Sequence, residues 1–246
     1  MAAQGEGMRP SVSIIIPIYN SARYLRQAIE SVLAQAGAEL EVLVVDDGSS
    51  DDGPEIASSY GALVKLIAIA HRGHPAARNA GVAASGGDFL AFLDADDLWT
   101  PDKLARQLST FAMDRDLHAV FGHMQNFISE ELGERERAKI KCNSTALPGL
   151  LQGSMLIRRE AFARVGPFAE ERRMGDFLDW YGRATLAKLN MRMLPETFVM
   201  RRIHLSNFQR THKHLRRENL VVLKKLLDLR RAAALSAHNC GASDVP

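Results

Sequence analysis

The chain has 246 residues, of which 46% are hydrophobic and 24% are charged. This length suits one domain with a sizeable core, because single cores stop growing near roughly 250 to 300 residues. Its 31 Lys and Arg residues and 29 Asp and Glu residues give a formal net charge of +2. Such a balance argues against a nucleic-acid-binding protein that relies on its overall charge.

The cysteine content and the absence of long apolar stretches indicate the compartment. Cys142 and Cys240 lie far apart in the sequence, which fits a reducing environment better than a disulfide scaffold. Residues 1–10 lack the apolar core of a signal peptide and are expected to be disordered. No stretch approaches the roughly 20 apolar residues of a membrane span. We therefore expect a cytoplasmic protein, whose only membrane contact would be peripheral and at the inner face.

The first hundred residues alternate between short apolar runs and helical patterns. The run at 42–45 carries no polar alternation, which is typical of a strand covered on both faces. After the first run, apolar residues recur at helical spacing, and Ser21 stands where it could cap that helix. Strand, helix and strand in repetition predict a doubly wound α/β fold with parallel strands. The predicted strands cover 12–20, 42–45, 63–70 and 88–93.

The second half has a less regular pattern. We expect a helix that begins at Thr100 and Pro101, a strand and a charged connection, then a strand with a short helix and a further helix. These elements complete a domain over 11–210. Their ranges are 101–115, 119–128, 130–138, 153–168 and 175–189.

A basic amphipathic helix is expected over 211–238, before a loose tail at 239–246. Its apolar residues could pack on the domain or form a homodimer seam. The same helix could instead lie on an anionic membrane surface, so the three alternatives stay open. The apolar residues are Leu220, Leu223, Leu226, Leu227 and Leu229.

Polar side chains gather where the predicted strands end. Ligands of open parallel sheets bind beyond the carboxyl ends of the strands. We therefore expect these side chains to converge on one rim, which would hold the functional site. They are Tyr19, Asn20, Asp46, Asp47, His71, Arg72, Asp94 and Asp96.

Asp94 and Asp96 follow the fourth predicted strand with little positive charge close by in the sequence. Close carboxylates repel each other unless something else lies between them. Their hard oxygen atoms favour Mn²⁺ or Mg²⁺, which is typically held by one or two carboxylates together with substrate phosphates. An alternative is that Asp96 or Asp97 only caps the following turn.

Four motifs occur in a particular order: VSIIIPIYN, EVLVVDDGSSDDG, HPAARNAGVAASGGDFLAFLDADDLWTPDKL and GSMLIRREAF. In order and spacing they resemble the family 2 glycosyltransferases, which are inverting enzymes with the GT-A fold, and the resemblance covers residues 10 to 205. It implies a mixed, mostly parallel sheet flanked by helices. It also implies metal-dependent transfer of a sugar from a nucleoside diphosphate sugar, with UDP as the first choice, to a hydroxyl acceptor. Surface polysaccharide or glycoconjugate synthesis is the expected setting.

The resemblance assigns residues to the nucleotide. Pro17, Tyr19 and Asn20 correspond to the first loop of the nucleotide site, and the Asp46–Asp47 pair to the position that accepts the ring N–H of the base. Asp46 could instead bond its own turn. Arg78 corresponds to a basic residue near the nucleotide, although an ion pair with an acidic neighbour would also explain it.

Further residues are assigned to the diphosphate and the metal. The resemblance places Asp94 near the ribose and Asp96 on the ion that bridges the phosphates. His204 is the candidate for a contact with the diphosphate or metal, with Arg201 and Arg202 behind it. A structural role for His204 stays open.

An inverting transfer also needs a base that takes the proton of the acceptor hydroxyl. The family places this acid four positions before a Trp, in a Glu-Asp pair. Counting back from Trp180 gives Asp176, but Gly175 stands where the family has Glu. Asp179, on nearly the same helix face, is therefore a second candidate, and both could simply solvate the helix start.

Two other functions compete with glycosyl transfer. A sugar-nucleotide pyrophosphorylase would need a Gly-rich loop with Arg and Lys after its first strand, and PIYNSARYL is no such loop. A non-catalytic nucleotide-sugar binding protein would keep the nucleotide residues and lack the base, and only Gly175 favours it.

Overall fold

The fold is a mixed sheet flanked by helices, as the sequence predicts. The structure is a computed structural model that describes residues 9–138, 140, 142–172, 174–205 and 224. Its sheet has nine strands in the order β3-β2-β1-β4-β8-β6-β9-β5, with β7 paired to β6. The strands are β1 Ser11–Ile18, β2 Glu39–Asp46, β3 Val64–Ala68, β4 Phe89–Phe92, β5 Leu98–Trp99, β6 Ala119–Ile128, β7 Leu147–Pro148, β8 Leu156–Arg158 and β9 Met191–Ile203.

Helices cover both faces of this sheet, which explains the unbroken apolar runs. Successive side chains of a strand point to opposite faces. Ile14 and Ile16 of β1 therefore join one core cluster with residues of α1, α2 and α4, whereas Ile15 joins a second cluster with α3, α6 and α7. The helices are α1 Ala22–Leu33, α2 Gly53–Ser58, α3 His74–Ala83, α4 Lys103–Met113, α5 Glu134–Arg137, α6 Arg159–Val165 and α7 Asp176–Leu186.

Helix α3 lies unusually close to β1. A Cβ atom added at Gly81 would stand 2.5 Å from Cγ2 of Ile15, so only glycine permits this approach. Arg78, three positions before Gly81 in α3, contacts Asp94 at the rim of the sheet.

The start of α1 differs in detail from the prediction. Ser21 is the N-cap residue, but its side chain makes no capping hydrogen bond and donates instead to the Tyr19 carbonyl. Asp51 accepts the hydrogen bond from the backbone N–H of Ala22 at 2.8 Å. The cap therefore comes from the loop after β2, which local sequence does not reveal.

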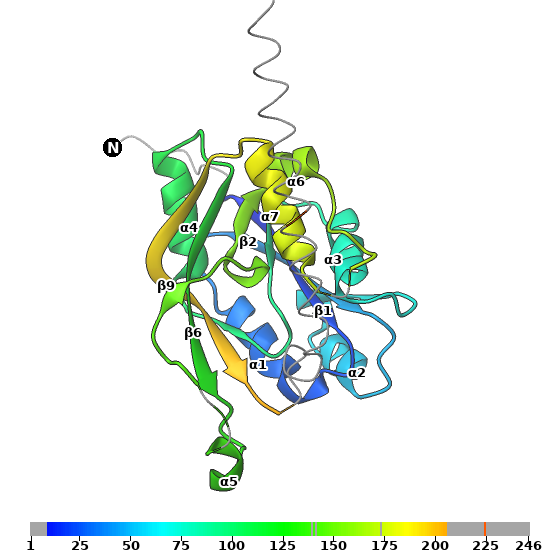
Figure 1. Ribbon diagram of the computed structural model, residues 1–246. Helices are drawn as coiled ribbons and strands as arrows, with labels where there is room; N and C mark the ends of the chain where they lie inside the picture. Colours follow the sequence, from blue (N-terminus) through cyan, green and yellow to red (C-terminus); the bar gives the residue numbers. More distant parts are fainter. Residues whose placement is uncertain (1–8, 139, 141, 173, 206–223, 225–246) are drawn as a thin grey trace, which may run out of the picture.

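The second half of the sheet holds the elements that the pattern did not predict. Strand β5 has two residues and exists through its pairing with β9, at Leu98↔Met200 and Trp99↔Val199. Arg201 and Arg202 lie inside β9, whereas the sequence placed them after a strand. Figure 1 shows β6 and β9 side by side along the molecule, with α5, a helix inside the predicted charged connection, beyond the end of β6.

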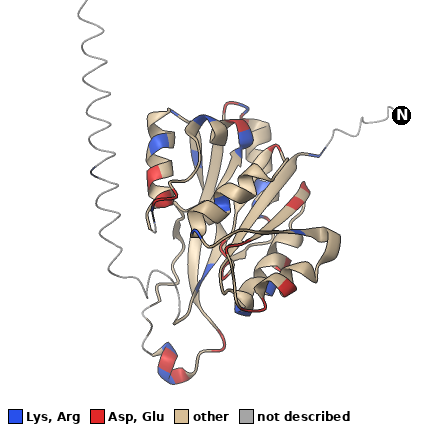
Figure 2. Ribbon diagram, turned by 90° about the vertical axis from the view of Figure 1, so that its right-hand side faces the viewer, with Lys and Arg blue, Asp and Glu red and all other residues tan. Residues whose placement is uncertain are grey.

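Charged residues of both signs are scattered over the helices and edges in the view of Figure 2. None of the helices in the described ranges has the length and apolar character needed to cross a bilayer. The expected helix over 211–238 and the tail at 239–246 lie outside the described residues apart from Lys224. Its packing, dimer and membrane alternatives therefore stay predictions.

Lys103 of α4 is fully buried beside Trp99, with Nζ 4.0 Å from the ring centroid and 2.8 Å from Oε1 of Gln107. Burial lowers the pKa of Lys103 well below its ordinary value. The folded protein therefore binds fewer protons here than the unfolded chain, and stability must rise with pH. We expect the free energy of unfolding to increase as the pH rises towards 10.5, the ordinary lysine value, and to increase less in Lys103→Met.

Urea unfolding followed by circular dichroism at each pH measures this difference. Lys65→Met, which changes an exposed lysine on β3, is the matched control and should keep the wild-type slope. Equal slopes in wild type and Lys103→Met would contradict the prediction.

Candidate active site

The carboxyl ends of β1, β2 and β4 meet at one edge of the sheet, because the three strands are parallel neighbours. The loops that follow them carry the predicted polar residues. Pro17 differs from the others, since it lies inside β1, is buried and pairs with Val45. The residues that the loops or strand ends bring to this rim are Tyr19, Asn20, Asp46, Asp47, Asp94 and Asp96.

Asn20 connects the first two loops, and Asp46 closes the turn of the second. Asn20 has a left-handed backbone, with φ 49°, and its Oδ1 accepts a hydrogen bond from the N–H of Ser50 at 2.8 Å. Asp46 accepts from the N–H of Ser49 at 2.9 Å. The turn-bonding alternative for Asp46 is therefore seen in the structure, and both side chains set the shape of the rim.

Asp47 draws in the loop after β3. Its two oxygens accept hydrogen bonds from the N–H groups of Arg72 at 2.7 Å and Gly73 at 2.8 Å, and Nδ1 of His71 lies 2.9 Å from Oδ2. The His71 ring stacks on Tyr19 with centroids 4.2 Å apart. Three loops thus present an aromatic pair at the rim, with Tyr19 40% exposed.

Arg78 connects two carboxylates from opposite parts of the site. One guanidinium nitrogen donates to Asp94 and the other to Asp176, each at 2.8 Å. Only 5% of Arg78 is exposed. Burial opposes the charged form of Asp94, but the charges of Arg78 and His74 and the hydrogen bonds from Arg78 and Gln152 together outweigh burial and lower the pKa of Asp94. Arg78 pairs with acidic neighbours, the alternative considered for it, and these neighbours are the predicted site carboxylates.

Asp96 is held by His204, the residue that directly follows β9. Nε2 of His204 lies 3.0 Å from Oδ2 of Asp96. The His204 ring also contacts the ring of Tyr24 on α1, with centroids 4.8 Å apart. The structure therefore brings the predicted histidine to the predicted metal carboxylate.

The next residue, Asp97, faces the interior. Only 5% of it is exposed, and Oδ1 accepts a hydrogen bond from the N–H of Arg202 at 2.9 Å. Burial, with the charges of Asp96 and Asp94, raises the pKa of Asp97 well above its ordinary value. Arg202 also donates from Nε to the Asp96 carbonyl at 3.0 Å. Arg202 of β9 therefore fixes the acidic turn with its backbone N–H and with its side chain.

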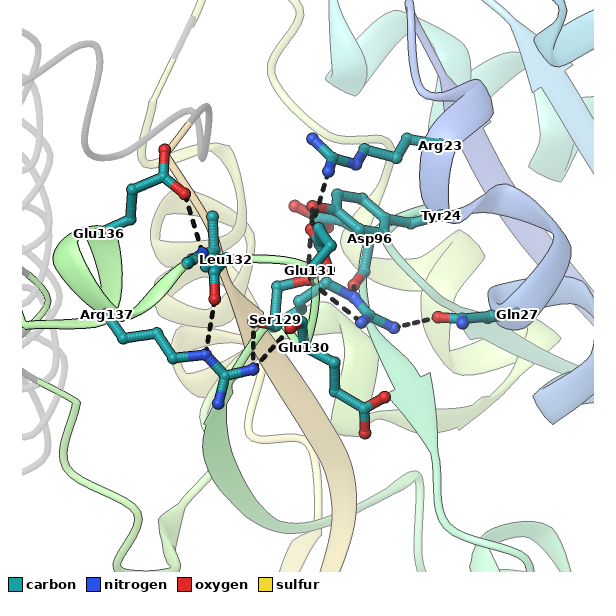
Figure 3. A network of polar contacts seen from close by, with 12 residues as sticks. Arg23, Tyr24, Gln27, Asp96, Ser129, Glu130, Glu131, Leu132, Glu136 and Arg137 are labelled. Atoms are coloured by element: carbon teal, nitrogen blue, oxygen red, sulfur yellow. Dashed lines mark hydrogen bonds and ion pairs between the residues drawn. The ribbon is translucent and has the colours of Figure 1, made fainter.

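Arg202 donates a hydrogen bond to Ser129 at 3.4 Å, and a polar network continues from Ser129 through the segment after β6 (Figure 3). Arg202 donates to Gln27 at 2.5 Å, and Ser129 and Tyr24 both donate to Glu131. Burial opposes ionisation of Glu131, but these two hydrogen bonds lower its pKa to about 2. Sequence reasoning missed Gln27, Tyr24, Ser129 and Glu131, because no local pattern relates α1 to a segment about a hundred residues later.

Asp176 is the first residue of α7, and Gly175 before it is the N-cap with φ 83° and ψ 9°. This left-handed conformation favours glycine, because other L residues are strained there. The departure from the family's Glu therefore has a structural reason in this chain. Gly175 is the residue at which α7 starts, and the next residue, Asp176, contacts Arg78.

Asp179 occupies a different environment. It is 2% exposed and pairs with Arg183 at 2.8 Å, while Nε of Arg172 lies 3.8 Å away. The adjacent Trp180 is fully buried among aromatic rings and donates to the Gly166 carbonyl at 3.0 Å. The structure thus directs Asp176 to the site cluster and Asp179 into the packing of α7.

Gln152 is a further site residue that the sequence reasoning did not identify. It belongs to the short helix η2, Gln152–Ser154, and its Nε2 donates to Oδ2 of Asp94 at 3.1 Å. The only signal was a polar residue between two apolar segments, which does not distinguish a site residue from a loop residue.

The sequence matches the family model of "Glycosyl transferase family 2" over residues 13–166. Among curated relatives, an uncharacterised glycosyltransferase of Nostoc sp. is 43% identical over 46% of this chain and 36% of its own length. The succinoglycan biosynthesis protein ExoO of Rhizobium meliloti is 36% identical over 66% of this chain and 48% of its own. The chain thus spans less than half the length of these relatives.

Solved structures show the same fold. The S. aureus TarS 1–349 structure in complex with UDP superposes with a TM-score of 0.63, at 20% identity, over 78% of this chain and 60% of that one. A complex of the same protein with UDP-GlcNAc also gives 0.63, at 19% identity, over 80% of this chain and 60% of that one. Because the family match covers more than half of the sequence, the chain belongs to glycosyl transferase family 2.

Proposed function

We propose that this protein transfers a sugar from a nucleoside diphosphate donor to a hydroxyl acceptor, with inversion at the anomeric carbon and with dependence on Mn²⁺ or Mg²⁺. The observation that carries the proposal is the row Asp94–Arg78–Asp176, joined by two contacts of 2.8 Å. One buried guanidinium there holds a carboxylate of the donor-side turn and a carboxylate of the acceptor-side helix.

Uridine is the proposed base and a surface polysaccharide or glycoconjugate the proposed product. The TarS complexes contain UDP and UDP-GlcNAc, and ExoO is named for succinoglycan biosynthesis. The exposed Tyr19–His71 pair offers a stacking surface beside Asp46 and Asp47, as a nucleotide base would require.

The donor set at the acidic turn fits a hard divalent cation. Within the described residues, no group of three or more His, Cys, Asp or Glu side chains forms a ready metal cluster. Mg²⁺ is commonly held by one or two carboxylates together with substrate phosphates, and Asp94 and Asp96 are the residues that would hold it here. When bound, the ion supplies Lewis-acid stabilisation of the negative charge on the departing diphosphate. His204 orients Asp96, and Arg202 fixes the backbone of the turn.

Asp176 is the proposed base. It accepts the proton of the acceptor hydroxyl as that oxygen forms its bond to the anomeric carbon, and the bond from this carbon to the diphosphate oxygen breaks. Arg78 fixes the orientation of the Asp176 carboxylate. The Asp176 side chain is 15% exposed and the Asp179 side chain 3% exposed, and this difference supports Asp176 over Asp179 in this role.

Thermal stabilisation by nucleoside diphosphate sugars, with and without MnCl₂, tests the donor and the metal together. A ligand at about 100 times its Kd should stabilise the folded state by about 2.7 kcal/mol. We expect UDP-sugars to raise the Tm of the wild type mainly when Mn²⁺ is present, and Asp96→Ala to remove the metal-dependent part.

Asp102→Ala serves as the matched control, since Asp102 is an exposed aspartate before α4 that pairs with Arg106. It should retain the wild-type response. If Mn²⁺ raised the Tm of Asp96→Ala with a UDP-sugar as much as it raises that of the wild type, the assignment of Asp96 to the metal would be refuted.

A further inference from the structure

The Asp94 carboxylate is held from two sides. Oδ1 accepts a hydrogen bond from Arg78 at 2.8 Å, and Nε2 of Gln152 donates to Oδ2 at 3.1 Å and to Oδ1 at 3.4 Å. The first donor is charged and comes from α3, whereas the second is a neutral amide and comes from η2. The row of site residues therefore extends to four members, Gln152, Asp94, Arg78 and Asp176.

The backbone that carries Gln152 is fixed by buried hydrogen bonds. The Gly153 carbonyl accepts from Nε1 of Trp99 at 2.9 Å, and the Ser154 carbonyl accepts from Nε2 of Gln107 at 2.8 Å. Trp99 lies in β5, directly after the acidic turn. The acidic turn and η2 are thus connected twice, once through Gln152 and Asp94 and once through Gly153 and Trp99.

Lys103 completes this attachment. Its Nζ donates to Oε1 of Gln107 at 2.8 Å and lies 3.5 Å from the Met155 carbonyl. Trp99, Lys103 and Gln107 are all buried, so these bonds are shielded from water and rigid. The proposed reaction makes no other use of these three side chains.

We propose that Gln152 is a positioning residue that fixes the plane of the Asp94 carboxylate for the nucleotide and its cation. The inference rests on the proposed function, which assigns Asp94 to the donor. Arg78 divides its donors between Asp94 and Asp176, so it anchors one oxygen of Asp94 and leaves rotation about the Cβ–Cγ bond. The amide of Gln152 removes that rotation without neutralising the carboxylate, and preorganised groups bind more tightly.

Calorimetric titration of UDP in the presence of MnCl₂ tests the proposal. Gln152→Met keeps the length of the side chain and removes the amide, and we expect UDP to bind about tenfold more weakly, as expected for loss of a hydrogen bond to a charged group. Gln152→His places an Nε2–H donor at a similar reach and should restore the affinity to within about threefold of wild type. A purely structural role for η2 would show no such rescue.

Gln125→Met, which changes a half-buried glutamine of β6, is the control and should bind as wild type does. Gln152→Leu replaces Gln152→Met if the latter lowers the Tm of the ligand-free protein. The proposed role of Gln152 would be overturned if folded Gln152→Met or Gln152→Leu bound UDP with wild-type affinity, or if Gln152→Met and Gln152→His weakened binding equally. Neither result would affect the proposed function. A wild-type protein that binds no UDP with Mn²⁺ would overturn the proposed function as well.

Discussion

Asp176→Asn should lower the kcat of sugar transfer by about 10² to 10⁴, the usual contribution of a general base, while the Kd for UDP in Mn²⁺ stays within about twofold of wild type. The amide cannot take the acceptor proton at neutral pH. Its oxygen can still accept the hydrogen bond that Arg78 now gives to Oδ2 of Asp176 at 2.8 Å. The donor side of the site should therefore keep its geometry.

Initial rates with saturating donor, together with calorimetric titration of UDP, separate the two effects. Asp179→Asn is the matched control on the same helix, because Asp179 is buried against Arg183. This variant should lose stability and, at a temperature where it is folded, retain transfer. The reverse result, an active Asp176→Asn and a folded but inactive Asp179→Asn, would move the base to Asp179.

The arrangement of the first hundred residues could be predicted because it depends on local patterns. Apolar runs without alternation require cover on both faces, and β1 shows this cover, with Ile14 and Ile15 in different core clusters. Parallel strands then force the following loops to one rim. This argument alone places Asn20, Asp46 and Asp94 at the rim.

Contacts between distant elements could not be predicted in this way. Gln152 and Asp94 are separated by 58 residues, and Tyr24 and Glu131 by 107, so no spacing in the sequence reports them. Strand β5 has two residues and depends on β9, which lies about a hundred positions later. Composition also cannot tell whether an aspartate serves a ligand or its own loop, and Asp46 shows the second use.

Arg78→Met should have the largest effect on stability, because it leaves two carboxylates without their shared cation. Breaking a buried ion pair by removing one partner costs about 3–5 kcal/mol, and Arg78 is 5% exposed. Arg78→Lys should recover only part of this loss, since one ammonium cannot reproduce two contacts of 2.8 Å made by a planar fork. Urea unfolding followed by tryptophan fluorescence measures both variants.

Arg106 provides a matched control, because it also bridges two carboxylates, Asp102 at 3.1 Å and Glu196 at 3.4 Å, but its side chain is 51% exposed. Arg106→Met should cost less than about 1 kcal/mol, as exposed pairs do. The pKa of Asp94 is lowered from 3.8 in the folded protein, so the stabilisation that Arg78 gives is complete above that pH and is lost as the pH falls below it. The difference in the free energy of unfolding between wild type and Arg78→Met should therefore shrink in acid. If this difference stays constant with pH, or if Arg78→Met costs no more than Arg106→Met, Arg78 does not hold Asp94 and Asp176 together.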